Sequence, residues 1–373
     1  MKKRFFRLLA LVLCVLMLVP VMAACTERGG DDDTTTTMQP AEPDDTPETP
    51  DTPEPPAIVS SVAQMELGKN GGMSYIVQLN DGRFIVIDGG VDDNSSRLRM
   101  LSYMKSKTNA EKPVIACWMI THLDGDHFDN AYAFLRSFRT RVEVQGFAYT
   151  FPKKEDFKVL PTDSADIRNY KIGALSLFDD KLPKWETLKN LYPDAEYWDM
   201  KADDKKTFAD VNIHVLITAN ERLPESVHTH NLRSAAFKMT FTQGTETEAD
   251  DKSFMVFGDC SGNERSQYML DTYGESVLKS DVMQVIHHGL AGGHTLLYLA
   301  VDPSICLWPQ NEERFAGRYD SNGNGDYTDD YQYCTQAAYN KVIRQNPNIQ
   351  HYHHSQTTVI NMSDLSVSVW TMN

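Results

Sequence analysis

Histidine and aspartate residues gather in one short segment of the chain, His122-Leu123-Asp124-Gly125-Asp126-His127. Imidazole nitrogens and carboxylate oxygens are common protein ligands of divalent metal ions, and their alternating spacing lets several of them converge when the loop curls around an ion. Burying four such groups together costs free energy unless they are paired or coordinated. The segment therefore predicts a metal site, although composition alone also allows an ordinary polar loop.

The elements around this segment are those that would position a metal site. The continuous apolar run 114–120 predicts a strand buried on both faces, and the pattern after the segment predicts a helix that begins near Asn130. Two later strand-like runs end in polar groups, Asp259 in one case and His287 in the other. Strand ends hold short loops accurately, so we expect these side chains to join the site.

The rest of the chain reads as alternating strands and helices. The stretch from about 149 to 206 is less regular and carries helical patches. Other strand-like runs lie at 74–79, 83–88, 211–217, 235–241, 254–257, 282–286 and 357–359, and a helix pattern covers 95–106.

The segment from Thr121 to His127 resembles the HxHxDH motif of the metallo-β-lactamase fold superfamily, with Asp124 in place of the second histidine. This HxDxDH version is similar to the hydrolase domain of ComEC-type DNA-uptake proteins. Four further segments resemble family features in the same order: 75–90, 231–234, 254–259 and 281–289. The ordered set is more specific than any single motif.

The resemblance implies an α/β (α+β) fold, a four-layer αββα sandwich with a metal site at one edge between the sheets. It implies His122 and Asp124 as ligands of one metal, and Asp126 and His127 as ligands of a second. Asp259 would bridge them and His287 would complete the second site. His288 is the alternative ligand, or else a proton donor to the leaving group. The superfamily usually supplies one more histidine ligand between the first motif and the bridging aspartate, and His230 is a candidate for it.

This ligand set mixes nitrogen and oxygen donors without a thiolate, which suits one or two zinc or manganese ions. Such ions activate a water molecule as the nucleophile, while carboxylates such as Asp126 and Asp259 orient it. We therefore expect a metal-dependent hydrolase, with a phosphodiester substrate favoured by the resemblance. The alternatives are a lactonase or β-lactamase-like hydrolase, and a non-catalytic surface binding module.

The N-terminus predicts export. A basic start and an apolar run end in Val21-Met22-Ala23-Ala24-Cys25, so residues 1–24 resemble a lipoprotein signal peptide with a lipid on Cys25. An uncleaved membrane anchor is the alternative. Residues 25–57, rich in Thr, Pro and acidic residues, predict a disordered linker to a hydrolase domain at 58–373. We expect this domain at the outer face of a bacterial cell membrane.

The charge of the chain argues against one class of partner. The net charge is -16, and residues 58–373 carry -11 of it once the signal and linker are set aside. An acidic domain repels polyanions, so strong nucleic-acid binding is not expected.

Two other polar clusters stand apart from these motifs. Asp320, Asn322, Asn324 and Asp326 resemble the start of a calcium loop, but the closing glutamate is absent, so an ordinary turn is the alternative. His351, His353 and His354 precede the last strand-like run, and we expect ordinary surface or core contacts for them.

Overall fold

The computed structural model describes residues 57–68, 71–219, 233–244, 250–290, 292–318, 320, 323–326 and 338–372. The predicted signal peptide and nearly all of the predicted linker lie outside these residues. No helix within the described part of the chain is long and apolar enough to cross a membrane.

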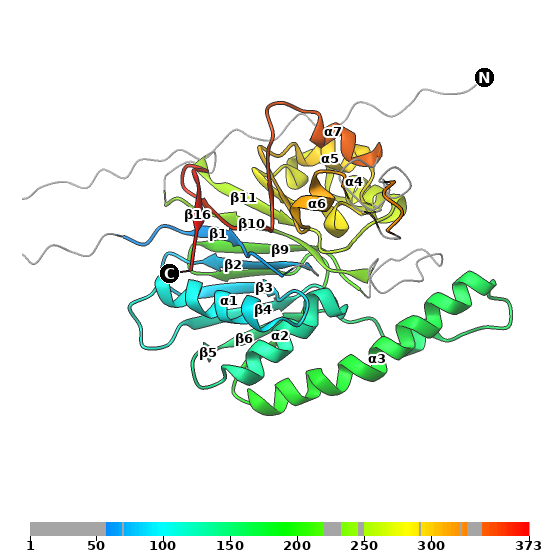
Figure 1. Ribbon diagram of the computed structural model, residues 1–373, viewed down its shortest axis with the longest axis horizontal. Coiled ribbons are helices and arrows are strands. Elements are labelled where there is room, and N and C mark those ends of the chain that lie inside the picture. The colour runs from blue at the N-terminus through cyan, green and yellow to red at the C-terminus, as the bar shows by residue number, and fades with distance from the viewer. Residues whose placement is uncertain are drawn as a thin grey trace, which may run out of the picture. The chain divides into compact units, whose positions relative to one another are not determined.

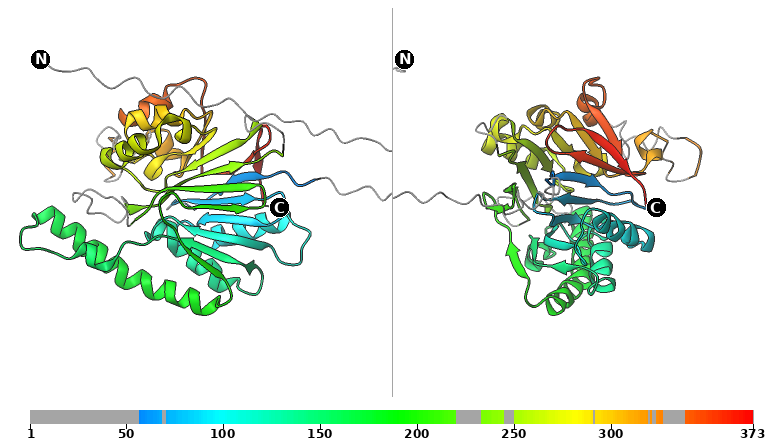
Figure 2. Two further views of the ribbon diagram at one scale, coloured as in Figure 1. Left: turned by 180° about the vertical axis from the view of Figure 1, so that it is seen from behind. Right: turned by 90° about the vertical axis from the view of Figure 1, so that its left-hand side faces the viewer.

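Two β-sheets form the centre of the domain (Figures 1 and 2). Sheet A has nine strands. Eight of them run in the order β16 (Val367–Trp370), β15 (Thr357–Asn361), β1 (Ser61–Gln64), β2 (Ser74–Gln78), β3 (Phe84–Asp88), β4 (Val114–Ile120), β6 (Gly146–Tyr149) and β7 (Glu196–Asp199); β5 (Glu143–Val144) also pairs with β4. Sheet B has seven strands in the order β14 (Gln350–His353), β13 (Ile305–Trp308), β12 (Val282–Gln284), β11 (Lys252–Val256), β10 (Ala236–Phe241), β9 (Val211–Ile217) and β8 (Lys205–Phe208).

Helices cover the outer face of each sheet. Sheet A is covered by α1 (Asn94–Ser106), α2 (Gly125–Ser137) and α3 (Ala165–Leu191), and sheet B by α4 (Asn263–Leu278), α5 (Thr295–Val301), α6 (Glu312–Phe315) and α7 (Lys341–Arg344) (Figure 1). Short 3₁₀ turns lie at Lys154–Phe157, Ile286–Gly289 and Ala338–Asn340. The layers are therefore helices, sheet A, sheet B and helices, as the αββα prediction requires.

Alternation along the strands produces this layering, because successive side chains of a strand point to opposite faces of its sheet. In β3, Phe84 and Val86 belong to the core under the helices, while Ile85 and Ile87 belong to the core between the sheets. In sheet B, Phe254 likewise faces the other sheet. Three apolar cores result, one between each pair of layers.

Two helices differ from the sequence-based prediction. Helix α2 begins at Gly125 rather than near Asn130, because Asp124 takes the N-cap position and its carbonyl accepts the amide of Phe128 at 2.8 Å. The first turn of α2 is polar, so the apolar pattern used to predict the helix begins only after it. Residues 165–191, within a stretch expected to be less regular with helical patches, form one continuous 27-residue helix despite Pro183 in its interior.

Candidate metal centre

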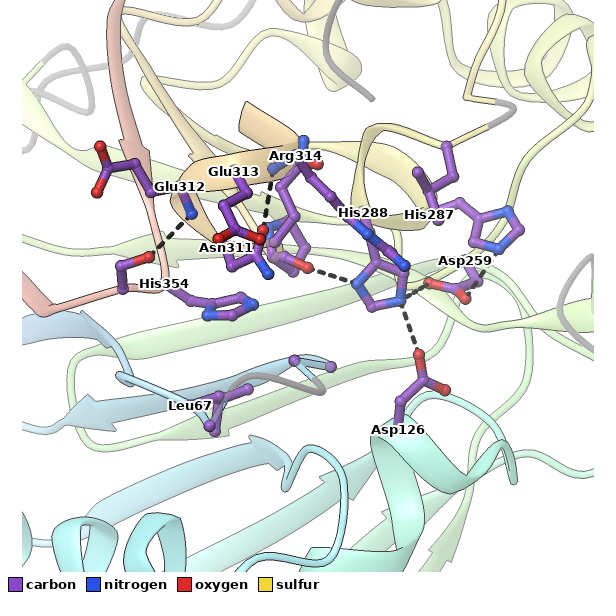
Figure 3. A pocket seen from close by; sticks show the side chains of 17 residues that line it. Leu67, Asp126, Asp259, His287, His288, Asn311, Glu312, Glu313, Arg314 and His354 are labelled. Atoms are coloured by element: carbon purple, nitrogen blue, oxygen red, sulfur yellow. Dashed lines mark hydrogen bonds and ion pairs between the residues drawn. The ribbon is translucent and has the colours of Figure 1, made fainter. Parts of the chain in front are cut away.

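The donors of the predicted metal site come together at one edge of the two sheets. His122 lies two residues after the end of β4, and Asp126 and His127 lie in the first turn of α2. Asp259 follows β11, and His288 follows β12. These two segments are far apart in sequence from the first motif, but the ends of their strands place their side chains against it (Figure 3).

His127 is the most firmly oriented of the donors. Its Nδ1 lies 2.7 Å from Oδ2 of Asp88, a fully buried carboxylate at the end of β3. A carboxylate accepts hydrogen bonds, so Nδ1 carries the proton and Nε2 is left to face the centre. Asp88 also accepts hydrogen bonds from the backbone amide and the hydroxyl of Thr121, at 2.8 and 2.7 Å.

Thr121 passes this orientation on to His122. Its hydroxyl hydrogen goes to Asp88, so its oxygen can accept from Nδ1 of His122 at 3.1 Å. The hydroxyl of Ser234 lies 3.2 Å from the same nitrogen. Nε2 of His122 is buried without a hydrogen-bond partner. It lies 3.7 Å from Oδ2 of Asp124 and 3.7 Å from Oδ2 of Asp259. Metal ligands are held in this manner, with one ring nitrogen oriented by the protein and the other kept for the ion.

Asp259 stands between two sets of donors, one at each of its oxygens. Oδ1 lies 3.3 Å from Nε2 of His127 and 3.4 Å from Nε2 of His288. Oδ2 faces His287 at 3.4 Å as well as His122. The carboxylate is 1% exposed, so water does not compensate for its charge. Its position is the one required of a bridging ligand.

The set at Oδ1 has the dimensions of a tetrahedral site. The two ring nitrogens of His127 and His288 are 3.2 Å apart, which closes a triangle with Oδ1 of Asp259. Ligand atoms about 2.0–2.1 Å from a tetrahedral zinc ion lie about 3.3 Å from one another. Asp126 adds a fourth donor, its Oδ2 being 3.2 Å from Nε2 of His288. The donors present therefore fit a divalent ion.

His287 and His288 occupy opposite sides of Asp259. Nδ1 of His288 donates to the carbonyl of Pro309 at 2.6 Å, which turns Nε2 toward Asp126 and His127. His287 lies on the His122 side, its Nδ1 3.3 Å from the hydroxyl of Ser261. Both residues have left-handed backbone conformations, with φ of 48° and 56°. Such conformations are costly outside glycine and tend to be kept at functional sites.

The charges of this cluster shift the pKa values of its members. Burial by itself would raise the pKa of Asp259, but His287, His127 and His288 outweigh it and hold that pKa well below its usual range. Burial by itself would lower the pKa of His288, but Asp259 and a hydrogen bond to Asp126 raise it to about 10. The pKa of His127 is likewise raised, chiefly by Asp259 against the opposing effect of burial. The carboxylates thus collect positive charge at this point, as protons or as a metal ion.

Several residues of the sequence-based predictions lie outside the described part of the chain. His230, Asn231 and Cys25 lie outside it, as does Asn322 of the predicted calcium loop. Within that loop the carboxylate of Asp320 accepts backbone amides from Gly323 at 2.6 Å and Gly325 at 2.8 Å. Those contacts are compatible with either a calcium loop or a turn.

Asp88 is the residue that motif reasoning passed over as a participant. The sequence does place an acidic residue directly after an apolar strand, within Ile87-Asp88-Gly89-Gly90. A carboxylate at that position is buried with the strand and needs a partner, which is the signal that could have identified it. Its partner, His127, lies 39 residues further along the chain.

A cavity of about 640 Å³ opens onto the metal centre (Figure 3). The cavity is lined by Asp126, Asp259 and both histidines of the His287–His288 pair, and by glycines 68, 71 and 72. It is also lined by two segments that follow strands β13 and β14, residues 309–314 and 354–355. The donor cluster is therefore reachable by a small molecule from one side.

Comparison with known proteins gives a family for part of the chain and remote structural similarities. Residues 67–245 match the family model described as the metallo-beta-lactamase superfamily. No curated protein matches the sequence.

Three solved structures illustrate the structural similarity. CmlA, a diiron beta-hydroxylase from Streptomyces venezuelae, is 12% identical with a TM-score of 0.44, covering 83% of this chain and 55% of CmlA, so this chain spans about half of that protein. The metallo-beta-lactamase fold protein YhfI from Bacillus subtilis is 11% identical with a TM-score of 0.40, covering 83% of this chain and 99% of YhfI. A long form RNase Z from yeast is 10% identical with a TM-score of 0.41, and the match covers 72% of this chain and 39% of the RNase Z chain.

The family match and the layered architecture agree. The matched residues include the motif from His122 to His127, and the two sheets lie between outer helices as in the sandwich expected from the sequence. Residues 67–245 are therefore similar to the metallo-beta-lactamase superfamily, and the layered architecture is consistent with the sandwich fold of that superfamily.

Proposed function

We propose that this protein is a metal-dependent hydrolase and that the cluster around Asp259 is its catalytic centre. One observation carries the proposal: the two oxygens of a single buried carboxylate each face ring nitrogens from separate strand ends. An uncompensated group of this kind would be costly to bury, whereas a divalent ion at either oxygen would be stabilised by it.

We assign His288, and not His287, to the ion held by Asp126 and His127. This reverses the preference drawn from the sequence, and it rests on the triangle of 3.2–3.4 Å formed with His127 and Asp259. His287 instead joins His122 and Asp124 at the other oxygen of Asp259, where the distances of 3.4–3.7 Å are longer. If a single zinc or manganese ion is bound, it occupies the tighter set.

A divalent ion in this place supplies Lewis acidity and a water molecule of lowered pKa. The low pKa of Asp259 keeps this carboxylate ionised, so it accepts rather than donates a proton. Asp126, which is 38% exposed at its side chain, reaches into the cavity, where it can orient the attacking water.

We favour a phosphodiester as the substrate class. The HxDxDH motif supports it through its resemblance to ComEC-type hydrolase domains. Arg314 also supports it, since this side chain lines the cavity and arginine offers planar, paired donors to phosphate oxygens. Exposed Glu312 and Glu313 line the same cavity, and their negative charge favours a small substrate over a polyanion.

The decisive experiment compares substrate classes on one preparation. The purified protein, loaded separately with zinc and manganese, is tested against bis(p-nitrophenyl) phosphate, a lactone and a chromogenic β-lactam. Hydrolysis of the phosphodiester alone would support the proposal. Hydrolysis of the lactone or the β-lactam alone would move the protein to the carboxylic class, and no stable metal binding would remove the catalytic proposal.

The N-terminal segment leads us to propose export and lipid attachment through Cys25 at the outer face of the membrane. The support is the sequence pattern of small residues before Cys25 after an apolar run. In a bacterial host, the full-length chain should incorporate labelled palmitate and partition into detergent, and Cys25→Ser should lose the label. Label retained by this variant would contradict the lipoprotein assignment.

A further inference from the structure

Sheet B delivers more polar residues to the cavity than a metal centre needs. Strands β11, β12, β13 and β14 are parallel neighbours, so their carboxyl ends lie at the same edge of the sheet. Successive strand ends carry Asp259, His288, Gln310 and His354. The first two belong to the donor cluster. The side chains of the other two line the same cavity and form no hydrogen bond with the metal donors within the described part of the chain. Ligands of such sheets bind at the carboxyl ends of the strands.

The side chains of Gln310 and His354 are buried without hydrogen-bond partners. They are 2% and 1% exposed, and neither the amide atoms of Gln310 nor the ring nitrogens of His354 find a partner in the described part of the chain. Their backbones are joined, because the amide of His354 donates to the carbonyl of Gln310 at 3.1 Å. Buried polar groups in native proteins almost always have hydrogen-bond partners. Two adjacent side chains without such partners therefore indicate a partner from outside the chain.

The two histidines just before it, His351 and His353, each have one ring nitrogen in a hydrogen bond, whereas neither ring nitrogen of His354 has one within the described residues; Nε2 of His351 is buried without a partner as well. Nδ1 of His351 accepts the indole N–H of Trp308 at 3.1 Å. His353 packs on the ring of Phe315 and receives the amide of Ser355 at 3.4 Å. Neither of these two histidines lines the cavity.

The chemistry of the pair indicates what kind of group it would bind. An amide offers donors and an acceptor and carries no charge. Burial lowers the pKa of His354 to about 4, so its ring is neutral near pH 7 and offers one donor and one acceptor. A neutral group that both donates and accepts matches this pair, whereas an ammonium or a carboxylate would leave part of it unsatisfied.

We propose that Gln310 and His354 form a specificity subsite for a neutral hydrogen-bonding group, a hydroxyl or an amide, on the substrate portion that lies beside the metal centre. This inference rests on the proposed function, because the group belongs to the molecule that is cleaved. On a phosphodiester it is part of the alcohol next to the scissile phosphate.

The test uses three phosphodiesters with one common leaving group. Each is a p-nitrophenyl ester whose second alcohol is butanol, glycerol or N-acetylethanolamine, so that the chemical step is matched and only the group offered to the subsite differs. The metal-loaded full-length protein should show kcat/KM about tenfold or more higher for the glycerol or the acetamide ester than for the butyl ester. The preferred ester identifies the group as a hydroxyl or an amide.

Two variants should abolish the preference. Gln310→Met keeps the length of the side chain without its polar atoms, and His354→Phe keeps a ring without its nitrogens. Each should bring the ratio of kcat/KM values close to one, while His353→Phe, the same change one residue earlier and outside the cavity, should preserve it. Equal kcat/KM for all three esters in the unmodified protein, or an unchanged ratio in Gln310→Met and His354→Phe, would overturn the subsite.

A binding measurement separates this proposal from the proposed function. In metal-free full-length protein labelled with ¹⁵N-histidine, the His354 ring signals are identified by their loss in His354→Phe. They should move when the glycerol or acetamide ester is added and stay in place with the butyl ester. If no ester is hydrolysed but the signals move, the phosphodiesterase proposal fails and the subsite stands. If esters are hydrolysed and the signals do not move, the subsite fails alone.

Discussion

The two sides of the metal centre differ in how far hydrogen bonds within the protein orient their buried polar side chains. On the sheet A side, Asp88 holds both Thr121 and His127, and Thr121 in turn contacts His122. On the sheet B side, His288 is held by one carbonyl, while the side chains of Gln310 and His354 have no hydrogen-bond partner among the described residues.

This difference separates two tasks. Oriented ligands with a fixed tautomer are what a metal ion requires before it binds, and the sheet A side provides them. Buried polar atoms without partners are what a site needs if its partner arrives later, because a ligand that satisfies them is distinguished from one that does not. We infer that the sheet A side is built for the metal and the outer part of the sheet B side for the substrate.

The largest effect should come from Asp259, which both sides share. Asp259→Asn keeps the size of the side chain and removes the charge that faces two sets of donors. The loss of metal affinity should exceed the roughly 10–100-fold typical of losing an outer hydrogen-bond partner. Metal content after dialysis and turnover should fall together, whereas Asp166→Asn, an exposed acid at the start of α3, should change neither. Full metal content in Asp259→Asn would refute the bridging role.

The next effect concerns the two adjacent histidines on the sheet B side. His288→Ala removes one corner of the 3.2–3.4 Å triangle, so it should lower both metal content and turnover. His287→Ala should be milder, because its ring lies in the looser set and is 22% exposed. Metal analysis of the two purified variants decides between them. A greater loss of metal in His287→Ala than in His288→Ala would support the sequence-based assignment of His287 as the ligand.

A smaller effect is expected from Asp88 on the sheet A side. Asn tolerates the positive φ of 53° at this position, so Asp88→Asn tests the hydrogen bond and not the backbone. The loss of the carboxylate should weaken metal binding by about 10–100-fold, because His127 loses the acceptor that fixes its tautomer. Competition with a chromophoric chelator measures this affinity. Thr121→Val leaves the contact between Asp88 and His127 in place, so it should weaken metal binding less than Asp88→Asn does. Equal losses of metal affinity in the two variants would mean that the whole network, and not the carboxylate alone, orients the His127 ring.

Much of the architecture could be predicted from the sequence, because alternation and continuous apolar runs mark the strands directly. The run 114–120 is β4 residue for residue, and the helix predicted at 95–106 begins one residue earlier. The continuity of the long helix α3 escaped prediction, although helical patches were expected there, because Pro183 interrupts its pattern and its buried face includes Lys171 and Lys181. Those lysines are paired with Asp163 and Asp129, at 3.0 and 2.6 Å, and such partners are invisible in a local pattern.

The same limit applies to the candidate site. The segment from His122 to His127 could be recognised because its donors are close together in the sequence. The choice between His287 and His288 could not be made, since two consecutive left-handed residues turn the rings to opposite sides of Asp259. The unsatisfied ring of His354 was equally hidden among three similar histidines, because burial and partners are properties of the folded chain.

The smallest effect tests whether the sheet A side is independent of the helix beside it. Asp93 caps α1, and its carboxylate accepts hydrogen bonds from the hydroxyl of Ser95 and from the hydroxyl and amide of Ser96, which lower its pKa to about 2. Asp93→Ala should cost about 1 kcal/mol of folding free energy. Because the folded pKa lies below the unfolded value of about 3.9, this stability is present above about pH 4 and disappears as the pH falls toward 2.

Urea unfolding of the two proteins at several pH values would reveal this difference, which should be constant from about pH 7 to 5 and shrink below about pH 4. Asp92→Ala, at an exposed neighbour that pairs with Arg97, should stay within about 0.5 kcal/mol. Metal affinity should be the same in all three proteins, since Asp88 and not α1 orients His127. A weaker affinity in Asp93→Ala would show that the metal side depends on the packing of α1, and the contrast between the two sides would then be one of degree.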